Sequence, residues 1–259
     1  MVTPAPEPPA FPGGTGVSGL SVYDWPAADG LCGGSPHVHL VCTEAYVVVA
    51  GAGRLQTLTA AGTAETPLRP GTVVWFGPGT VHRAVNDGGL RAVVVMQNSG
   101  LPEAGDAVFT FPSGVLADPE AYAAAARAGD AREARRRRDL AVAGFRALAG
   151  RTGDGVAAGA DGGGTDGGGG HGAAALEEFH RQALALRAGR LTEWEEVWRA
   201  GARQAADRTA AQLAALRAGD TGHLRTAAVA VREPPGTPRW GMCGRLDTYD
   251  LTPGGATGG

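Results

Sequence analysis

The sequence of 259 residues contains no lysine and no isoleucine, so every basic side chain other than histidine is an arginine. Without lysine, the chain cannot form a lysine Schiff base, use a lysine as general base, or hold a phosphate with the lysine of a P-loop. Any cation that holds a substrate anion must therefore be an arginine, a histidine or a metal ion.

Other features that several functional classes need are also missing. The three cysteines, Cys32, Cys42 and Cys243, form no CxxC pair, so we expect free thiols in a reducing cytoplasm. A net charge of −3 gives no electrostatic reason to bind nucleic acid or a membrane surface. No apolar run approaches the roughly 20 residues of a membrane helix. The Pro- and Gly-rich stretch 1–16 lacks the pattern of a secretory signal, and we expect it to be disordered.

From residue 17 to residue 112 the chain consists of short apolar or alternating segments, separated by residues that favour turns. Many short strands at this spacing predict an all-β sandwich or barrel. The expected strands span residues 19–25, 38–41, 45–50, 54–58, 72–76, 81–85 and 90–97, with turns at 51–53, 69–71, 77–79 and 86–89.

After residue 112 the composition changes to an Ala- and Arg-rich helical pattern. Residues 113–149 predict a helical segment, in which Asp118 precedes Pro119 as an N-cap. Residues 150–175 are rich in Gly, Ala and Asp and predict a flexible linker. Residues 176–253 predict a second helical region, with a tail that docks on the rest of the protein, the barrel mouth being one candidate. The chain as a whole is then of the α+β class.

Three patterns in this half have a structural and a functional interpretation. The arginine run 135–138 indicates either a patch for an anion or partner, or a solvated helix face balanced by nearby carboxylates, and we favour the solvated face. Residues 224–232 could add one more strand. A stripe at helical spacing is expected to cover the barrel or a subunit partner, and Gly201 on the same face would let another backbone approach: Trp194, Val197, Trp198, Ala205 and Leu216.

Two stretches of the barrel region hold side chains that suit a metal ion. On a strand, His37 and His39 point to the same face, roughly 7 Å apart along the backbone. Glu44 follows five residues later, and His82 comes after the turn at 77–79. Two imidazoles on one face, a third from a later strand and one carboxylate make a first shell of N and O ligands.

Written out, these stretches are His37-x-His39-x4-Glu44-x6-Gly51 and Gly71-x5-Gly77-Pro78-Gly79-x2-His82-x3-Asn86. They resemble the pair of motifs that defines the cupin superfamily, over residues 17–112. The resemblance implies an all-β jelly-roll barrel with one metal ion in its bore. It matches His37, His39, Glu44 and His82 to the four metal ligands, and Gly51, Gly71, Gly79 and Asn86 to structural positions.

The sequence departs from the family pattern at two positions. Leu31 stands where the first motif usually opens with glycine, and Gly77 stands where the second usually has proline. A Gly-Pro-Gly turn can still reverse the chain, so these departures concern the turns and leave the ligands in place.

The spacing also makes a structural demand. On one uninterrupted strand Glu44 would face away from both His37 and His39, because their separation from it is odd. Strand parity must therefore break between Leu40 and Thr43, through a bulge or a tight turn. A single regular strand over 37–48 would exclude the four-ligand site.

Three imidazoles and one carboxylate leave one or two positions open on a six-coordinate divalent ion, and Fe, Mn, Ni, Co, Cu and Zn are all compatible. Glu44 could leave the ion to accept a proton, and Tyr46 shares its face of the strand, so both are candidate catalytic residues. Other side chains could line the bore, although packing or solvent exposure explains each at least as well: Tyr23, Trp25, Gln56, Trp75, Arg83, Arg91 and Gln97.

Two classes of function fit such a site. The first is a metal-dependent enzyme acting on a small, oxygen-rich, chelating substrate, either as a dioxygenase or as a redox-neutral isomerase or epimerase of a sugar-like substrate. Isomerases of sugar phosphates that resemble this superfamily tend to place a lysine near the metal, so the missing lysine favours oxygen chemistry or a substrate without a phosphate group. The second is a non-enzymatic module that binds a metal or small ligand. We expect a cytoplasmic homodimer with no nucleic-acid or membrane partner.

Overall fold

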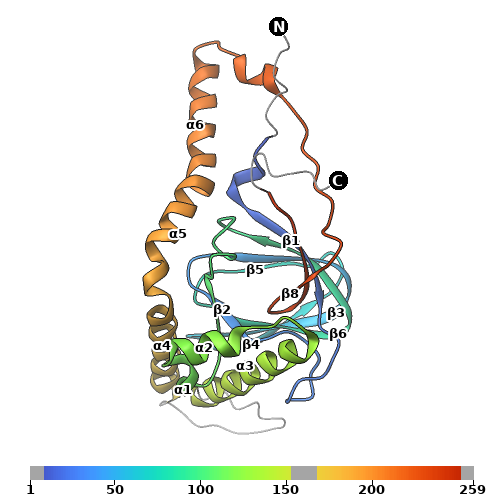
Figure 1. The fold of residues 1–259 in the computed structure, drawn as a ribbon, viewed down its shortest axis with the longest axis vertical. Coiled ribbons are helices and arrows are strands. Elements are labelled where there is room, and N and C mark those ends of the chain that lie inside the picture. The colour runs from blue at the N-terminus through green and yellow to red at the C-terminus, as the bar shows by residue number, and fades with distance from the viewer. Residues whose placement is uncertain (1–8, 153–167, 252–259) are drawn as a thin grey trace.

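The computed structural model describes residues 9–152 and 168–251, with side chains left undescribed at 168–171. Within these residues, nine strands form one antiparallel sheet that wraps around a common interior (Figure 1). The strands are β1 (Gly16–Val22), β2 (His37–His39), β3 (Glu44–Thr59), β4 (Gly62–Leu68), β5 (Val73–Phe76), β6 (Val81–Met96), β7 (Ala107–Phe109), β8 (Arg239–Trp240) and β9 (Gly244–Thr248).

Strands β3 and β6 are longer than the sequence pattern predicts. Each was expected as two strands around a turn, but each runs through as one strand, and the two pair antiparallel with register shifts between Val48 and Gly53. The two expected turns lie opposite each other, and a Cβ on Gly51 would come within 2.1 Å of the Gly89 carbonyl oxygen. The glycines therefore permit a β-bulge in the paired strands β3 and β6 at this point.

The buried residues form two hydrophobic clusters. One fills the barrel and includes Leu20, Tyr46, Leu55 and Met96, as expected from the alternating burial along β3. The other lies between the β2–β7 side of the barrel and the first helices, and includes Val38, Phe109 and Phe145. The helices thus complete the core of one side of the barrel.

Three helices follow the barrel: α1 (Ser113–Leu116), α2 (Pro119–Ala126) and α3 (Ala131–Arg151). Asp118 caps α2 as predicted, since its carboxylate accepts from the Glu120 and Ala121 backbone N–H groups. Helix α3 packs tightly on the barrel end, where a Cβ on Gly144 would overlap the Thr110 carbonyl oxygen.

The expectation that the arginine run 135–138 is a solvated face is wrong for two of its four members. Arg137 and Arg138 are only 6% and 1% exposed, because α3 turns this face toward the barrel and the tail. Arg138 donates to the backbone carbonyls of Trp25 and Pro26 and pairs with Asp139.

A column of helices runs along the side of the barrel, and its last helix extends beyond it (Figure 1). It consists of α4 (Gly168–Arg187), a 3-10 turn (Ala188–Arg190), α5 (Leu191–Trp198), a π-helical turn (Arg199–Arg203) and α6 (Gln204–Arg217). Helix α4 begins within the expected linker 150–175, where Gly172 lies close against the Thr152 backbone. Residues 153–167 of that linker lie outside the described residues.

Only the first part of the predicted stripe covers the barrel. Trp194 is 3% exposed and donates its indole N–H to the Ala104 carbonyl at 3.0 Å. Val197 packs on the barrel cluster, whereas Trp198 and Leu216 are 38% and 46% exposed. Beside Gly201, Ala202 contacts the 3-10 turn Pro12–Gly14, because Gly14 has no Cβ to prevent it. Residues 9–16, expected to be disordered, are held there.

The tail, residues 218–251 after α6, returns to the barrel. The predicted strand at 224–232 is wrong, since a 3-10 turn (Gly222–Thr226) is followed by irregular chain. Farther on, β9 pairs with β1 and carries β8 on its other edge. This places residues 240–243 beside the interior of the barrel.

No helix in the described ranges is long and apolar enough to cross a membrane.

Candidate metal centre

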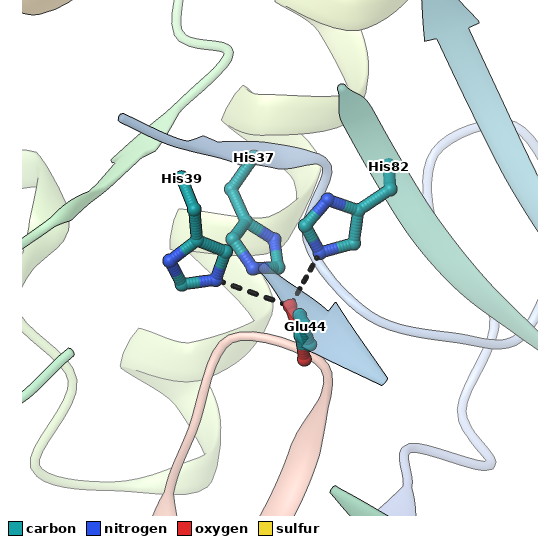
Figure 2. A group of neighbouring side chains, drawn as sticks. All are labelled: His37, His39, Glu44 and His82. Carbon is teal, nitrogen blue, oxygen red and sulfur yellow. Dashed lines mark ion pairs between the residues drawn. The ribbon is translucent and has the colours of Figure 1, made fainter. Parts of the chain in front are cut away.

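Four buried side chains meet inside the barrel (Figure 2). His37 and His39 come from β2, Glu44 from the first residue of β3, and His82 from β6. One nitrogen or oxygen atom of each lies within 4.8 Å of all the others. The Nε2 atoms of His39 and His82 are each 3.1 Å from the same oxygen of Glu44. We call these four residues the metal centre.

The predicted break in strand parity is present. Strand β2 ends at His39, residues 40–43 form a bend, and a new strand begins at Glu44. His37 is paired directly with His82 across the ladder, so the histidines of two strands face each other. The bend turns Glu44 onto the same interior, as the four-ligand arrangement requires.

A residue that the sequence pattern did not reveal holds this bend in place. Asp106 is fully buried, and its carboxylate accepts hydrogen bonds from the backbone N–H groups of Leu40, Val41 and Cys42. The same carboxylate lies 2.9 Å from Nδ1 of His39. One side chain thus fixes both the parity break and the orientation of a ligand. The only available signal was a lone aspartate just before the apolar strand Ala107–Phe109.

The hydrogen bonds of the imidazoles determine which nitrogen faces the centre. Nδ1 of His37 lies 2.9 Å from the Ser35 carbonyl, and Nδ1 of His82 lies 3.1 Å from the Thr80 carbonyl. Carbonyl oxygens only accept, so Nδ1 must carry the proton in both rings. In the neutral form, Nε2 of each ring then presents a lone pair to the interior, which is the form that binds a metal.

Two of the atoms that face each other are acceptors with no donor. With His39 and His82 neutral, the buried atoms Glu44 Oε2 and His82 Nε2 lie 3.1 Å apart with no donor between them. Such pairs are costly unless a proton or a cation lies between them. Three imidazole nitrogens and a carboxylate within 4.8 Å of one another suit a divalent transition metal, so the residues fit the ion.

Without an ion, the charge of the cluster depends on which of its side chains are protonated. Burial favours the neutral form of His39, but its hydrogen bonds with Asp106 and Glu44 outweigh this and raise its pKa to about 9. Burial also opposes ionisation of Glu44, yet hydrogen bonds with His39 and His82 hold its pKa well below the usual value. The His37 pKa is lowered well below its usual value by burial and by the neighbouring His82 and His39.

Tyr46, the second candidate catalytic residue, is buried on the same face of β3 as Glu44. Its hydroxyl lies 3.5 Å from the Cys243 sulfur, and burial, with Cys243 and Glu44 nearby, raises its pKa well above the usual value. Tyr46 is therefore a phenol rather than a base near neutral pH. Its catalytic role stays a prediction.

Other residues considered for the bore lie elsewhere or have structural partners. Trp75 is 70% exposed, while Arg83 is buried and pairs with Asp29. Asn86 does not face the metal centre; its amide donates to the Val22 carbonyl and its oxygen accepts from the Gly88 and Leu90 backbone. Asn86 therefore stabilises the bulged region of the β3–β6 pair.

A cavity of about 400 Å³ opens onto the metal centre, with His39 and Glu44 in its wall. Much of the wall is apolar and comes from β1, β6 and the tail. Its polar members include two arginines from the helical half, Arg137 and Arg187. The sequence pattern did not connect either arginine with the site, because α3 and α4 reach it only through tertiary packing.

One family model matches part of the chain. Residues 28–97 match the family model described as Cupin domain. No curated protein matches the sequence. Among solved structures, the chain is similar to the TDP-quinovose 3,4-ketoisomerase WlaRB of Campylobacter jejuni, with 13% identity, 31% of this chain and 59% of that chain covered, and a TM-score of 0.27.

Two further solved structures are similar over comparable lengths. The Streptomyces protein PAC13 with uridine has 16% identity, covering 42% of this chain and 70% of that chain, with a TM-score of 0.27. A cupin protein of Bacteroides fragilis has 17% identity, covering 33% of this chain and 65% of that chain, with a TM-score of 0.24. The chain thus spans less than two thirds of the Campylobacter and Bacteroides proteins.

Proposed function

Residues 28–97 of this chain form a cupin domain, and from that premise we propose that the protein is a metal-dependent enzyme of the dioxygenase type that acts on a small chelating substrate. The observation that carries the proposal is the meeting of three imidazoles and one carboxylate at the wall of a cavity large enough for a small organic molecule.

The lining of the cavity favours oxygen chemistry over isomerisation of a sugar. A sugar presents several hydroxyl groups, each of which needs a hydrogen-bond partner when it is buried. The wall next to His39 and Glu44 instead includes Leu20, Val94 and Met96. The missing lysine points away from isomerases of sugar phosphates that place a lysine near the metal.

The residues of the chain have separable tasks in this proposal. His37, His39, Glu44 and His82 would hold the ion, which supplies Lewis acidity and an open coordination position when bound. Asp106 keeps His39 oriented through Nδ1. Glu44 would be the candidate proton acceptor only on leaving the ion and its two imidazole neighbours, because those neighbours hold its pKa well below the usual value. The apolar wall excludes water from the reacting end.

Elemental analysis and oxygen consumption test the proposal together. Purified protein is compared with His37→Ala and Glu44→Ala variants for metal content, and then supplied with Fe(II) or Ni(II) and small hydroxy-carbonyl chelators in air. We expect metal in the parent protein only, and oxygen uptake that depends on metal and chelator. Equal metal in all three proteins would overturn the site. Bound metal and product without oxygen uptake would favour a redox-neutral reaction, and bound metal with neither would favour a binding module.

A further inference from the structure

We infer that the cavity beside the metal centre selects an organic carboxylate, held at its anionic end by Arg137 and Arg187 and along its apolar body by the cavity wall. This inference names the substrate class of the proposed enzyme, and it rests on the proposed function for what happens at the metal end. The carboxylate site itself stands on the contacts of the two arginines, which we call the arginine pair.

Arg137 is a buried cation with neutral partners. It lies on the barrel-facing side of α3 and is 6% exposed. Its guanidinium donates to the carbonyls of Ala126 at 3.4 Å and Trp240 at 3.3 Å, and to that of Gly241. It also lies over the ring of Phe109, 5.1 Å from the centroid. None of these partners carries a negative charge.

Arg187, the last residue of α4, reaches the same place from another element. It donates to the Ala107 carbonyl at 3.0 Å and to the Tyr122 hydroxyl at 3.3 Å, and lies over the Tyr122 ring. The Tyr122 hydroxyl in turn accepts from the Phe109 backbone N–H. Arg137 thus packs on Phe109 and Arg187 on Tyr122, and all four residues line the cavity. His39 and Glu44 line the same cavity, so the arginine pair and the metal centre share it.

Neither member of the arginine pair has a carboxylate partner within the described part of the chain. Other buried arginines do, as Arg83 pairs with Asp29 and Arg138 with Asp139. Of the acidic residues in the cavity wall, Glu44 faces His39 and His82, and Glu103 is exposed. The Nε atoms of both Arg137 and Arg187 are buried and lack an acceptor.

Arg137 is buried and Arg187 is half-buried, and a cation withdrawn from water without a counterion carries a cost that an anionic ligand removes. In a chain without lysine, arginine is the side chain available to pair with such an anion. Its planar guanidinium matches the two oxygens of a carboxylate. Several N–H groups of the pair are already used by carbonyls, and the Nε–H groups of both are among those that remain. The neighbouring apolar side chains favour an anion that carries a hydrocarbon body: Leu20, Val94, Met96, Met242 and Leu246.

Calorimetric titration with three probes tests the inference on the full chain. Benzoate, its neutral analogue benzamide and inorganic phosphate are titrated into metal-free and Zn(II)-loaded protein. We expect benzoate to bind about tenfold or more tightly than benzamide, from the value of hydrogen bonds to charged groups. Phosphate should bind more weakly than benzoate because it cannot use the apolar wall.

Variants assign the binding to the arginine pair. Arg187→Gln should weaken benzoate about tenfold or more and leave benzamide unchanged. Arg181→Gln is the matched control, since Arg181 lies on the same helix but is exposed and pairs with Glu178. Arg137→Gln should have the same effect as Arg187→Gln. Because Arg137 also holds the tail, the thermal unfolding of the Arg137→Gln variant is measured in parallel. If Arg137→Gln does not fold, the result for Arg187→Gln alone decides whether the carboxylate site exists.

The outcomes separate this inference from the proposed function. Equal affinity for benzoate and benzamide, tighter binding of phosphate, or an unchanged Arg187→Gln variant would each overturn the carboxylate site, whatever the metal does. Discrimination of benzoate in a protein that binds no metal would support the site and sink the enzyme. Metal-dependent oxygen uptake without that discrimination would do the reverse.

Discussion

The metal centre and the arginine pair face one cavity but are built in opposite ways. The four residues of the metal centre come from neighbouring barrel strands, and carbonyls two residues away orient His37 and His82. Arg137 and Arg187 come from two helices that reach the cavity only when the C-terminal half packs on the barrel. The metal centre thus depends mainly on strand neighbours and on Asp106, whereas the proposed binding of a carboxylate depends on the packing of the helices against the barrel.

The largest effect expected is loss of the metal when the centre is changed. Glu44→Gln keeps the shape of the side chain but removes its charge, and we expect bound metal to fall to background in elemental analysis. The fold should persist in circular dichroism, because the strands around the centre have their own packing. Glu103→Gln, an exposed neighbour in the same cavity wall, is the control and should keep its metal.

Replacing Asp106 sharpens the comparison, because this residue links the barrel bend to the centre. Asp106→Asn removes a buried charge that holds three backbone N–H groups and His39. We expect the free energy of unfolding to fall by about 3 to 5 kcal/mol, and metal affinity to fall by about 10- to 100-fold. Denaturant unfolding and a competition assay for the metal measure the two effects. An unchanged metal affinity would mean that His39 is oriented by its packing alone.

The pH dependence of stability tests the charges of the metal-free centre. Folding raises the pKa of His39 from 6.5 to about 9, so the folded protein holds a proton that the unfolded chain releases in this range. The contribution is complete below pH 6.5 and is lost as the pH rises through about 9. We expect stability to fall by up to about 3 kcal/mol across that window.

His39→Ala is the control for this titration and should remove most of the slope. Metal-loaded protein should behave in the opposite sense, because the ion requires the neutral imidazole and binds more tightly as the pH rises. The same slope with and without metal would show that the ion does not bind at His39.

The smallest effect expected is at the anchor of the tail. The Tyr23 hydroxyl donates to the Gly241 carbonyl at 2.9 Å, next to the segment that lines the cavity. Tyr23→Phe should cost about 1 kcal/mol in thermal or denaturant unfolding, and should leave metal content unchanged. A loss of metal in this variant would contradict the prediction that metal binding does not depend on how the tail is anchored.

The parts of the site that could be predicted from sequence are those that depend on spacing along one strand. Alternation placed His37 and His39 together, and the odd interval to Glu44 required the bend that the structure contains. Asp106 and Arg187 could not be found this way, since their partners are set by tertiary contacts that no local period records. Arg137 was misjudged because charge balance describes an isolated helix and not one pressed against carbonyls of a distant tail.

The same limit explains the errors in the fold. The glycines at 51–53 and 86–89 favour turns by composition, but here they allow a β-bulge within the continuous pairing of β3 and β6. Whether a glycine ends a strand or bends it depends on the strand opposite, which is unknown from sequence alone. The cap at Asp118 was predictable because every atom of it lies within four residues.

The pairing of β9 with β1 has a consequence for the order in which the site is assembled during synthesis. All four residues of the metal centre leave the ribosome long before residues 240–248, so that side of the cavity is the last to be completed. Until β9 arrives, β1 presents one unpaired edge to the surrounding solution. The tail is therefore both the last wall of the cavity and the cover of an otherwise adhesive strand.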